Sequence, residues 1–327
     1  MSLVTVWFLL ICVLWTGYLV LEGFDFGAGA LVRALGHTHE ERGALIRTYG
    51  PFWDGNEVWL LVAGGATFAA FPDWYATLFS GFYIALFVLL VVIILRNVAI
   101  EFWGKDAGGA WKTRWEWCLV ICSALPPVLL GVAWANIAHG VPLTAEGEYA
   151  GTFWTLLNPY ALCGGVCTLA LFLAHGAHFL ALRTSGVLHE RSVLAAHRLS
   201  TVALLLVAVF GAWTLALGSE PLMVVLIAVA VLAAAGAAWR SRLGSEGWAF
   251  ALSAVAVTAL FCALFAWLYP NAMAASSGPA LSLEAAASSH YTLKVMTVVA
   301  AIFTPLVLLY QGWTYWVFRR RVGIEAA

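Results

Sequence analysis

Four carboxylates in or beside long apolar runs are the residues of this sequence most able to do chemistry. Glu22 and Asp25 lie inside the run LVLEGFDFGAGAL, and Asp54 and Glu57 open the next apolar run. Both pairs have i, i+3 spacing, which places the two acids on one helix face, about 4.5 Å apart along the axis. An ionisable side chain at membrane depth costs about 2.5–3.5 kcal/mol on insertion scales, so such residues are candidates for function. Paired carboxylates in an apolar segment suit proton transfer.

Each pair also has a static alternative. The spacing Gly23-x-x-x-Gly27 lets helix backbones approach closely, so Glu22 and Asp25 could form a hydrogen-bonded pair that only fixes packing. We favour a relay, because two acids within one helical turn are an expensive way to pack helices. For Asp54 and Glu57, helix capping and dipole interactions explain the pattern equally well.

The composition predicts a polytopic membrane protein. Hydrophobic residues make up 63% of the 327 residues and charged residues 10%, whereas soluble domains are about 25% charged. This length accommodates nine spans of about 20 residues and leaves no room for a sizeable extramembrane domain. Hydropathy places the nine expected helices at Val4–Ala34, Trp53–Phe71, Tyr75–Val98, Trp115–Ile137, Phe153–Leu182, Val193–Leu217, Met223–Trp239, Trp248–Tyr269 and Tyr291–Phe318.

The basic residues predict the orientation of these spans. Every Lys and Arg except Lys294 falls in or beside a connection on one side of the nine-span arrangement. By the positive-inside rule, the N-terminus is outside and the C-terminus is cytoplasmic. Asp54 then lies at the cytoplasmic surface and Asp25 deeper on the neighbouring helix, so the acids form an inward series. An interfacial helix is expected to begin near His37, and the outer loop 270–290 is expected to form a surface cap.

Other candidate residues favour less specific roles. His175 and His178 have i, i+3 spacing and could ligate haem, but they lie near a predicted interface, so we favour a structural or snorkelling role. Lys294 and His290 lie at the outer end of the last span and are candidates for contact with a quinone or a lipid. Arg96 is expected to pair with Glu101 across a loop. The six cysteines lie in apolar segments without a CxxC, so neither a disulfide nor a zinc site is expected.

No nucleotide-binding, zinc-protease or hydrolase motif occurs in the sequence. A self-contained ATPase or hydrolase is therefore excluded. The sequence does resemble subunit II of the cytochrome bd quinol oxidases over all nine spans. The matching segments are GFDFGAGAL (23–31), PFWDGNEVWLLVAGGATFAAFP (51–72), FSGFYIALFVLL (79–90), PPVLLGVAWANIAHGVP (126–142), LLNPYALCGGV (156–166) and SSHYTLKVMT (288–297).

This resemblance implies an all-α fold in a single membrane domain, residues 1–327. Two four-helix bundles, at 1–137 and 153–269, are followed by a ninth helix at 288–321. It also implies a heterodimer with a haem-bearing subunit I, often with a small single-helix subunit, in the bacterial inner membrane. The complex is an electrogenic respiratory enzyme that oxidises quinol and reduces dioxygen to water. Haems b and d belong to subunit I, and this chain holds no catalytic residue and no metal.

In this family the acids of the GFD and WDGN motifs line a proton path toward the haems. Here those acids are Asp25 and Asp54, with Glu22 and Glu57 beside them. Some members also hold a structural quinone in subunit II. The alternative from a different class is a proton-coupled secondary transporter that uses the same carboxylates, although the matching broken helices of such folds are not obvious here.

Overall fold

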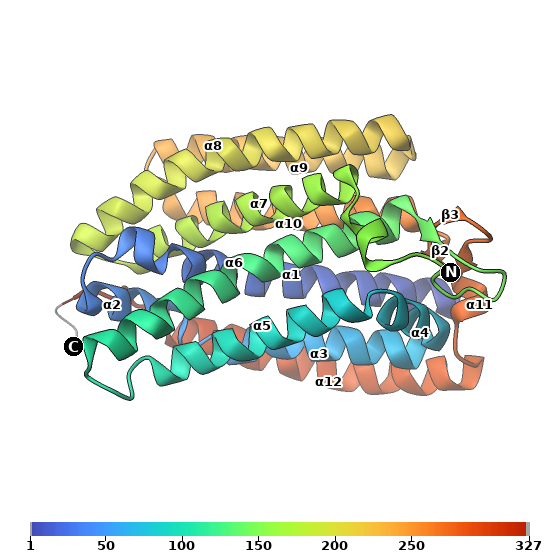
Figure 1. Cartoon of the computed structure of the whole chain (residues 1–327), viewed down its shortest axis with the longest axis horizontal. Coiled ribbons are helices and arrows are strands. Elements are labelled where there is room, and N and C mark those ends of the chain that lie inside the picture. The colour runs from blue at the N-terminus through green and yellow to red at the C-terminus, as the bar shows by residue number, and fades with distance from the viewer. Residues whose placement is uncertain (1, 325–327) are drawn as a thin grey trace.

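The computed structural model describes residues 2–324 as an elongated bundle whose long helices run along one axis (Figure 1). Its helices are α1 (Leu3–Leu35), α2 (His39–Tyr49), α3 (Trp53–Ala70), α4 (Pro72–Gly81), α5 (Tyr83–Phe102), α6 (Gly109–His139), α7 (Pro159–Arg183), α8 (Gly186–Leu217), α9 (Pro221–Arg242), α10 (Glu246–Leu268), α11 (Leu283–Ala286) and α12 (His290–Val317). The short elements are β1 (Val141–Pro142), the 3-10 helix η1 (Phe153–Leu157), β2 (Asn271–Met273), β3 (Ala275–Ser277) and β4 (Leu281–Ser282).

Within residues 2–324, eight helices are long and apolar enough to cross a membrane: α1, α5, α6, α7, α8, α9, α10 and α12. The prediction of a helical, multi-span membrane protein is therefore confirmed. The second predicted span corresponds to α3, which has 18 residues and opens with the polar segment WDGNE. Because α3 is not among the eight, the total of nine spans stays a prediction.

The third predicted span is divided into two helices. Helix α3 ends at Ala70, and Pro72 begins α4, where a proline suits the first turn because its missing N–H has no intrahelical partner. Phe82 then separates α4 from α5. Next to it, Gly81 lies so close to Tyr149 of the outer loop that an added Cβ would stand 2.6 Å from the tyrosine Cβ. The expected single helix over Tyr75–Val98 is wrong because this tertiary contact interrupts an apolar run that looks continuous in the sequence.

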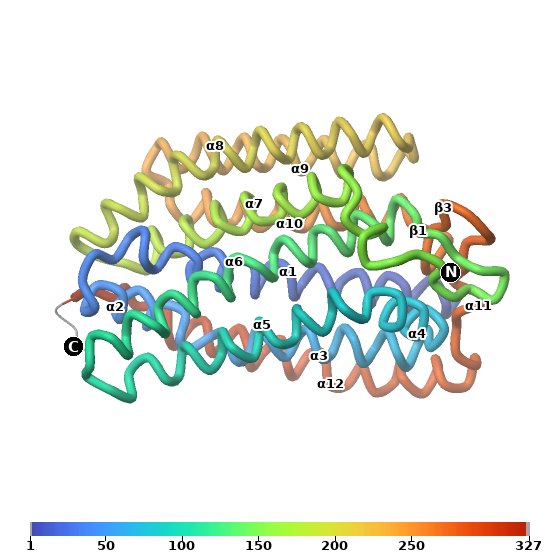
Figure 2. The backbone as a smooth tube through the Cα atoms, viewed as in Figure 1, coloured from blue at the N-terminus to red at the C-terminus, as the bar shows by residue number. Residues whose placement is uncertain are grey.

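The two ends of the bundle are formed by different elements (Figure 2). Helix α2, the α5–α6 connection and the last turn of α12 lie at one end, together with the start of α3. The first turn of α1 lies at the other end, with the four strands and α11. The terminal residues 1 and 325–327 lie outside the described residues, and the side of the membrane that each end faces stays a prediction.

A helix is present where the interfacial helix was predicted, and residues 270–290 contain short strands and a helix at the predicted cap. Thr38 and Glu41 form a reciprocal capping box that starts α2. At the opposite end, β1 pairs with β3 in parallel and β2 pairs with β4 in antiparallel fashion. The Ser288 N–H donates to the Ala70 carbonyl at 2.9 Å, which ties the cap to the end of α3.

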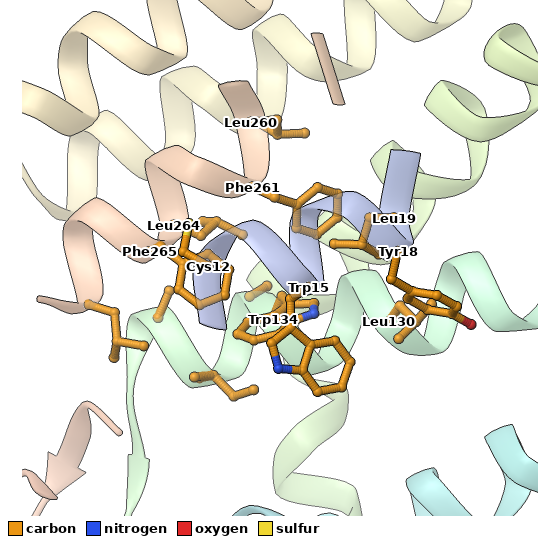
Figure 3. Packing of buried hydrophobic residues seen from close by; sticks show 14 of the residues in the cluster. Cys12, Trp15, Tyr18, Leu19, Leu130, Trp134, Leu260, Phe261, Leu264 and Phe265 are labelled. Carbon is orange, nitrogen blue, oxygen red and sulfur yellow. The ribbon is translucent and has the colours of Figure 1, made fainter. Parts of the chain in front are cut away.

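Helix α1 lies at the centre of the bundle, against α3, α6, α7 and α10. Figure 3 shows aromatic side chains of α1, α6 and α10 in this core. The ring centroids of Trp15 and Trp134 are 5.3 Å apart, and those of Trp134 and Phe265 are 4.7 Å apart. Side chains on the central helix are therefore withdrawn from lipid on most sides.

Glycines bring α1 and α7 into backbone contact beside the acidic residues. A Cβ added to Gly27 would stand 1.9 Å from the Phe172 carbonyl oxygen, and one added to Gly176 would stand 2.3 Å from the Ala28 nitrogen. Only residues without a side chain fit such a crossing. The predicted close approach of helices next to Asp25 is thus confirmed.

The helices differ widely in how much of their apolar surface the chain itself covers. In the most apolar 18-residue window, 78% of residues are buried in α7, 28% in α5 and 6% in α12. The exposed side chains of α5 and α12 are mainly large aliphatic and aromatic residues. One face of the bundle, formed by α3, α5 and α12, therefore presents bare apolar surface.

Candidate functional site

A cluster of charged side chains is buried where α1, α3 and α5 meet. Glu22 and Asp25 of α1 are both fully buried, as is Arg96 of α5. The Arg96 guanidinium forms an ion pair with Glu22 and lies 3.6 Å from Oε2 of Glu57 on α3. It also lies over the Phe26 ring, 4.7 Å from the centroid, where the ring face attracts a cation.

This arrangement corrects one expectation. Arg96 was expected to pair with Glu101 across a loop, but its side chain points into the bundle and contacts Glu22 and Glu57. A guanidinium buried without a carboxylate would carry a large desolvation cost. The two acids of neighbouring helices offset that cost better than a pairing at the exposed helix end.

Asn56 holds Asp25 from the opposite side of the cluster. Its Nδ2 donates to Oδ2 of Asp25 at 2.6 Å and lies 3.3 Å from the Leu21 carbonyl. Its Oδ1 accepts hydrogen bonds from Nε2 of Gln311 at 3.0 Å and from the Tyr315 hydroxyl at 2.8 Å. The Asn56 amide thus connects Asp25 on α1 with α12, which otherwise packs loosely on the bundle.

Several polar atoms of this region are enclosed and find no hydrogen-bond partner among residues 2–324. In the cluster these are Oε2 of Glu22, Oδ1 of Asp25, Oε2 of Glu57, and Nε and Nη2 of Arg96. The Tyr49 hydroxyl and Ser123 Oγ share this property. Both hydroxyl oxygens lie beside Gly29, about one helical turn from Asp25. Buried polar groups are nearly always hydrogen-bonded in folded proteins, so this concentration of unpaired atoms distinguishes the region.

The structure brings three of the four predicted acids together and leaves the fourth at the surface. Glu22, Asp25 and Glu57 share the cluster, and Glu57 also accepts a hydrogen bond from the Tyr18 hydroxyl at 3.4 Å. Asp54 is exposed in the first turn of α3 and makes no hydrogen bond to the other three. It lies one helical turn before Glu57, toward the α2 end of the bundle.

The other candidate side chains lie elsewhere. Lys294 and His290 are exposed on the first turns of α12, at the end opposite to Asp54. His175 and His178 are buried, so the snorkelling alternative is wrong for both. His175 Nδ1 lies 2.7 Å from Ser253 Oγ, and His178 Nε2 lies 2.8 Å from Ser200 Oγ. These contacts join α7 to α10 and to α8.

A second buried carboxylate, which the sequence patterns did not single out, lies at the α2 end. Glu116 of α6 is fully buried and accepts from Arg33 at 2.7 Å and from Arg42 at 2.8 Å. His39 Nδ1 lies 2.6 Å from its other oxygen, and Trp103 Nε1 donates to that oxygen at 3.2 Å. A Glu in a loop-proximal helix turn looks solvated in sequence, and only the positions of α1, α2 and α5 reveal its surroundings.

The part of the chain that the structure describes contains no arrangement of side chains typical of a metal site. Over residues 2–324, no group of three or more His, Cys, Asp or Glu side chains is arranged to hold a metal ion. The buried histidines bond to serines from different helices instead of converging on one point. The cluster instead consists of three carboxylates, one guanidinium and the Asn56 amide.

Comparisons with known proteins identify the family of the chain. Residues 3–318 match the family model of cytochrome bd terminal oxidase subunit II. The chain is 38% identical over 334 residues to cytochrome bd ubiquinol oxidase subunit 2 of Bacillus subtilis, covering 98% of this chain and 97% of that protein. It is 33% identical over 362 residues to cytochrome bd-I ubiquinol oxidase subunit 2 of Escherichia coli K12, covering 98% and 95%.

A solved structure shows the same fold. The bd oxidase from Geobacillus thermodenitrificans contains a chain that superposes with a TM-score of 0.78 at 15% identity, with 97% of each chain covered. The resemblance found from the WDGN and GFD segments is confirmed by a match over nearly the whole chain. This chain belongs to the cytochrome bd terminal oxidase subunit II family and is a subunit of a quinol oxidase complex.

Proposed function

We propose that this subunit carries protons from the cytoplasm toward the oxygen-reduction site of a haem-bearing partner subunit. Asp54, Glu57, Glu22 and Asp25 are the proton-binding groups in this proposal. The observation that carries it is the make-up of the cluster, which holds three carboxylates and one guanidinium: Arg96 contacts Glu22 and Glu57, and Asp25 beside them bonds to Asn56. One cation cannot balance three buried anions, so the cluster has sites for exchangeable protons.

The positions of the acids define the order of transfer. Asp54 is exposed at the α2 end, where a proton can be taken from water, and Glu57 follows one turn later with its side chain 14% exposed. Arg96 lies between Glu57 and Glu22, and Asp25 lies one turn from Glu22 on the same helix face. The unpaired oxygens of Glu22 and Asp25 can accept hydrogen bonds from water molecules that bridge the remaining gaps.

The Tyr49 hydroxyl and Ser123 Oγ extend the polar interior from Asp25 toward the α2 end. Both are enclosed and unpaired, and each can donate and accept a proton through hydrogen bonds with water. They offer a second branch by which Asp25 can be reprotonated.

The bare apolar face of α3, α5 and α12 is the surface that we assign to the partner subunit. Association in lipid depends on packing and buried polar contacts, because apolar surface alone gains little there. Asp54 lies at the edge of this face, and Gln311 and Tyr315 of α12 connect the face to Asp25 through Asn56. Docking at this face brings the partner next to the proton-binding cluster.

Further assignments follow from membership of the family and are part of this proposal. The haems belong to the partner subunit, and the complex lies in the bacterial inner membrane with Asp54 on its cytoplasmic side. Lys294 and His290, at the far end of α12, are available to contact a lipid or a quinone headgroup.

Two substitutions test the path in the intact complex. Asp25→Asn and Asp54→Asn should each slow quinol-driven oxygen consumption by about tenfold or more, because one positioned proton-transfer group typically contributes about 10²–10⁴ in rate. The haem absorbance spectrum should stay unchanged, since neither residue lies near a metal site in this subunit.

Asp73→Asn is the matched control. Asp73, like Asp54, is an exposed acid in the first turn of a helix, but it lies at the opposite end of the bundle. It should leave oxygen consumption at the wild-type rate. Wild-type turnover in both Asp25→Asn and Asp54→Asn would reject the proposed path.

A further inference from the structure

Two cysteines from distant parts of the chain meet between α1 and α10. Cys12 and Cys262 are separated by 250 residues, yet their Sγ atoms lie 3.8 Å apart. Thr16 Oγ1 lies 3.9 Å from each sulfur. The sequence predicted no disulfide because neither residue belongs to a CxxC, but the packing of the helices places the two thiols in van der Waals contact.

One of these thiols also lines a cavity. A cavity of about 480 Å³ lies among α1, α3, α10 and α12, and its lining includes Thr16 and Cys262. Most of the remaining lining is apolar, with Val13, Val20 and Leu308 among its residues. A lipid-soluble molecule of moderate size can therefore reach Cys262 without crossing polar surface, while Cys12 lies behind it and is buried.

We propose that Cys12 and Cys262 form a dithiol pair that a quinone oxidises to a disulfide linking α1 to α10. One S–S bond forms and two S–H bonds break. The two electrons and two protons pass to the quinone, whose two carbonyl oxygens become the hydroxyls of a quinol. The oxidant needs no separate source, because a quinol oxidase releases quinone into the membrane as its product.

The chain contains a matched pair of thiols that cannot react in this way. Cys118 and Cys122 also lie with their sulfurs 3.9 Å apart, but they are four residues apart on α6. Helix geometry holds such Cβ atoms about 5–6 Å apart, whereas a disulfide needs about 3.5–4.5 Å. Cys12 and Cys262 lie on different helices, so their side chains are free of this constraint.

The test uses the purified, intact complex after reduction and removal of the reductant. The complex is incubated without oxygen with a short-chain benzoquinone, all remaining thiols are blocked with N-ethylmaleimide, and peptides are mapped by mass spectrometry without reduction. We expect a linked peptide that contains both Cys12 and Cys262, in most molecules and only after quinone addition. Cys118 and Cys122 should remain fully alkylated.

Cysteine variants and thermal unfolding test the formation of the Cys12–Cys262 link independently. Cys262→Ser should abolish the linked peptide, and Cys118→Ser should leave it unchanged. Quinone should raise the thermal unfolding temperature of the wild type and of Cys118→Ser, because the link closes a very long loop, and a reductant should reverse the shift. Cys262→Ser should show no such shift.

Three results would overturn the inference. Full alkylation of Cys12 and Cys262 after quinone treatment would show that the pair does not react. A quinone adduct on Cys262 in place of the linked peptide would show addition instead of oxidation. Equal linkage by hydrogen peroxide without quinone would show that the quinone is not the specific oxidant.

Discussion

Two buried charged clusters both include side chains of α1, and the hydrogen-bonding needs of their carboxylates are met in opposite ways. Around Glu116, a single carboxylate accepts from two arginines, a histidine and a tryptophan. Around Arg96, a single guanidinium contacts Glu22 and Glu57, a third carboxylate, Asp25, lies beside them, and several oxygens and nitrogens have no partner among residues 2–324. The residue types are similar, but the ratio of donors to acceptors is reversed.

In the function that we propose, this difference separates a structural cluster from a proton-binding one. The Glu116 cluster is complete, so a proton added to it would displace a charge-assisted hydrogen bond. It fastens α1, α2, α5 and α6 together at the end of the bundle. The Arg96 cluster has unused hydrogen-bonding capacity and more acid than base, as the proposed proton path requires.

The largest effect is expected from removing the central cation. Arg96→Met should destabilise the subunit by about 3–5 kcal/mol, because it leaves buried carboxylates without their partner. The yield and the thermal unfolding temperature of the assembled complex measure this loss. Arg33→Met is the control, because Glu116 retains Arg42 and His39, and it should cost only about 1–2 kcal/mol. Equal losses in both variants would show that the two clusters do not differ.

The two buried glutamates should separate stability from turnover. Glu116→Gln should lower stability by about 2 kcal/mol through loss of charge-assisted hydrogen bonds, with oxygen consumption per haem unchanged. Glu22→Gln should slow oxygen consumption, with a smaller loss of stability, because the amide cannot take up and release a proton. Thermal unfolding and oxygen-electrode rates on the same samples decide this. A normal rate in Glu22→Gln would remove Glu22 from the path.

A smaller effect should sharpen the role of α12. Tyr315→Phe removes the hydroxyl that donates to Asn56, which should cost about 1 kcal/mol and moderately slow turnover because Asn56 then orients Asp25 less firmly. Tyr310→Phe is the matched control on the same helix, since Tyr310 is exposed and far from Asn56 in the helix register. A decrease in turnover of equal size in both variants would argue against this role.

The smallest effect concerns pH at the α2 end. Burial raises the pKa of Glu41, but hydrogen bonds from the His37 and Thr38 N–H groups and from Arg191 outweigh it and hold the pKa below its ordinary value of 4.5. The resulting stability is fully present above pH 4.5 and is lost as the pH falls through the folded-state pKa. Between pH 6 and pH 3.5, the unfolding temperature of the wild type should therefore fall more than that of Glu41→Gln. Parallel curves would contradict this.

Much of the fold could be predicted from the sequence because apolar runs and basic loops report directly on membrane spans. The sequence could not show that Tyr75–Val98 is divided, because the division depends on Gly81 packing against Tyr149 of a loop that lies far away in sequence. Hydropathy is least informative for α3, because its first turns contain polar residues, and two of these, Asn56 and Glu57, contact the buried cluster.

The candidate site could be predicted only in part. Spacing identified Glu22, Asp25 and Glu57, but the basic and amide partners Arg96 and Asn56 were misplaced or missed. An arginine near the end of a span usually extends toward the membrane interface. Arg96 points into the bundle because Glu22 and Glu57, on two other helices, lie there, and the sequence does not show that these helices are neighbours. Asn56 lies between Asp54 and Glu57 in the sequence, and the spacing of charged residues singles out only these two acids. The Asn56 amide nevertheless donates a hydrogen bond to Asp25.

The most direct test of the account is proton uptake during a single turnover. Fully reduced complex is mixed with oxygen while a pH-sensitive dye and the haem absorbance of the complex are recorded together. We predict that Asp25→Asn leaves oxygen binding at its normal rate but delays proton uptake, and slows the later haem steps by the same factor. Proton uptake at the wild-type rate in Asp25→Asn would contradict the claim that the buried acids of this subunit carry the protons.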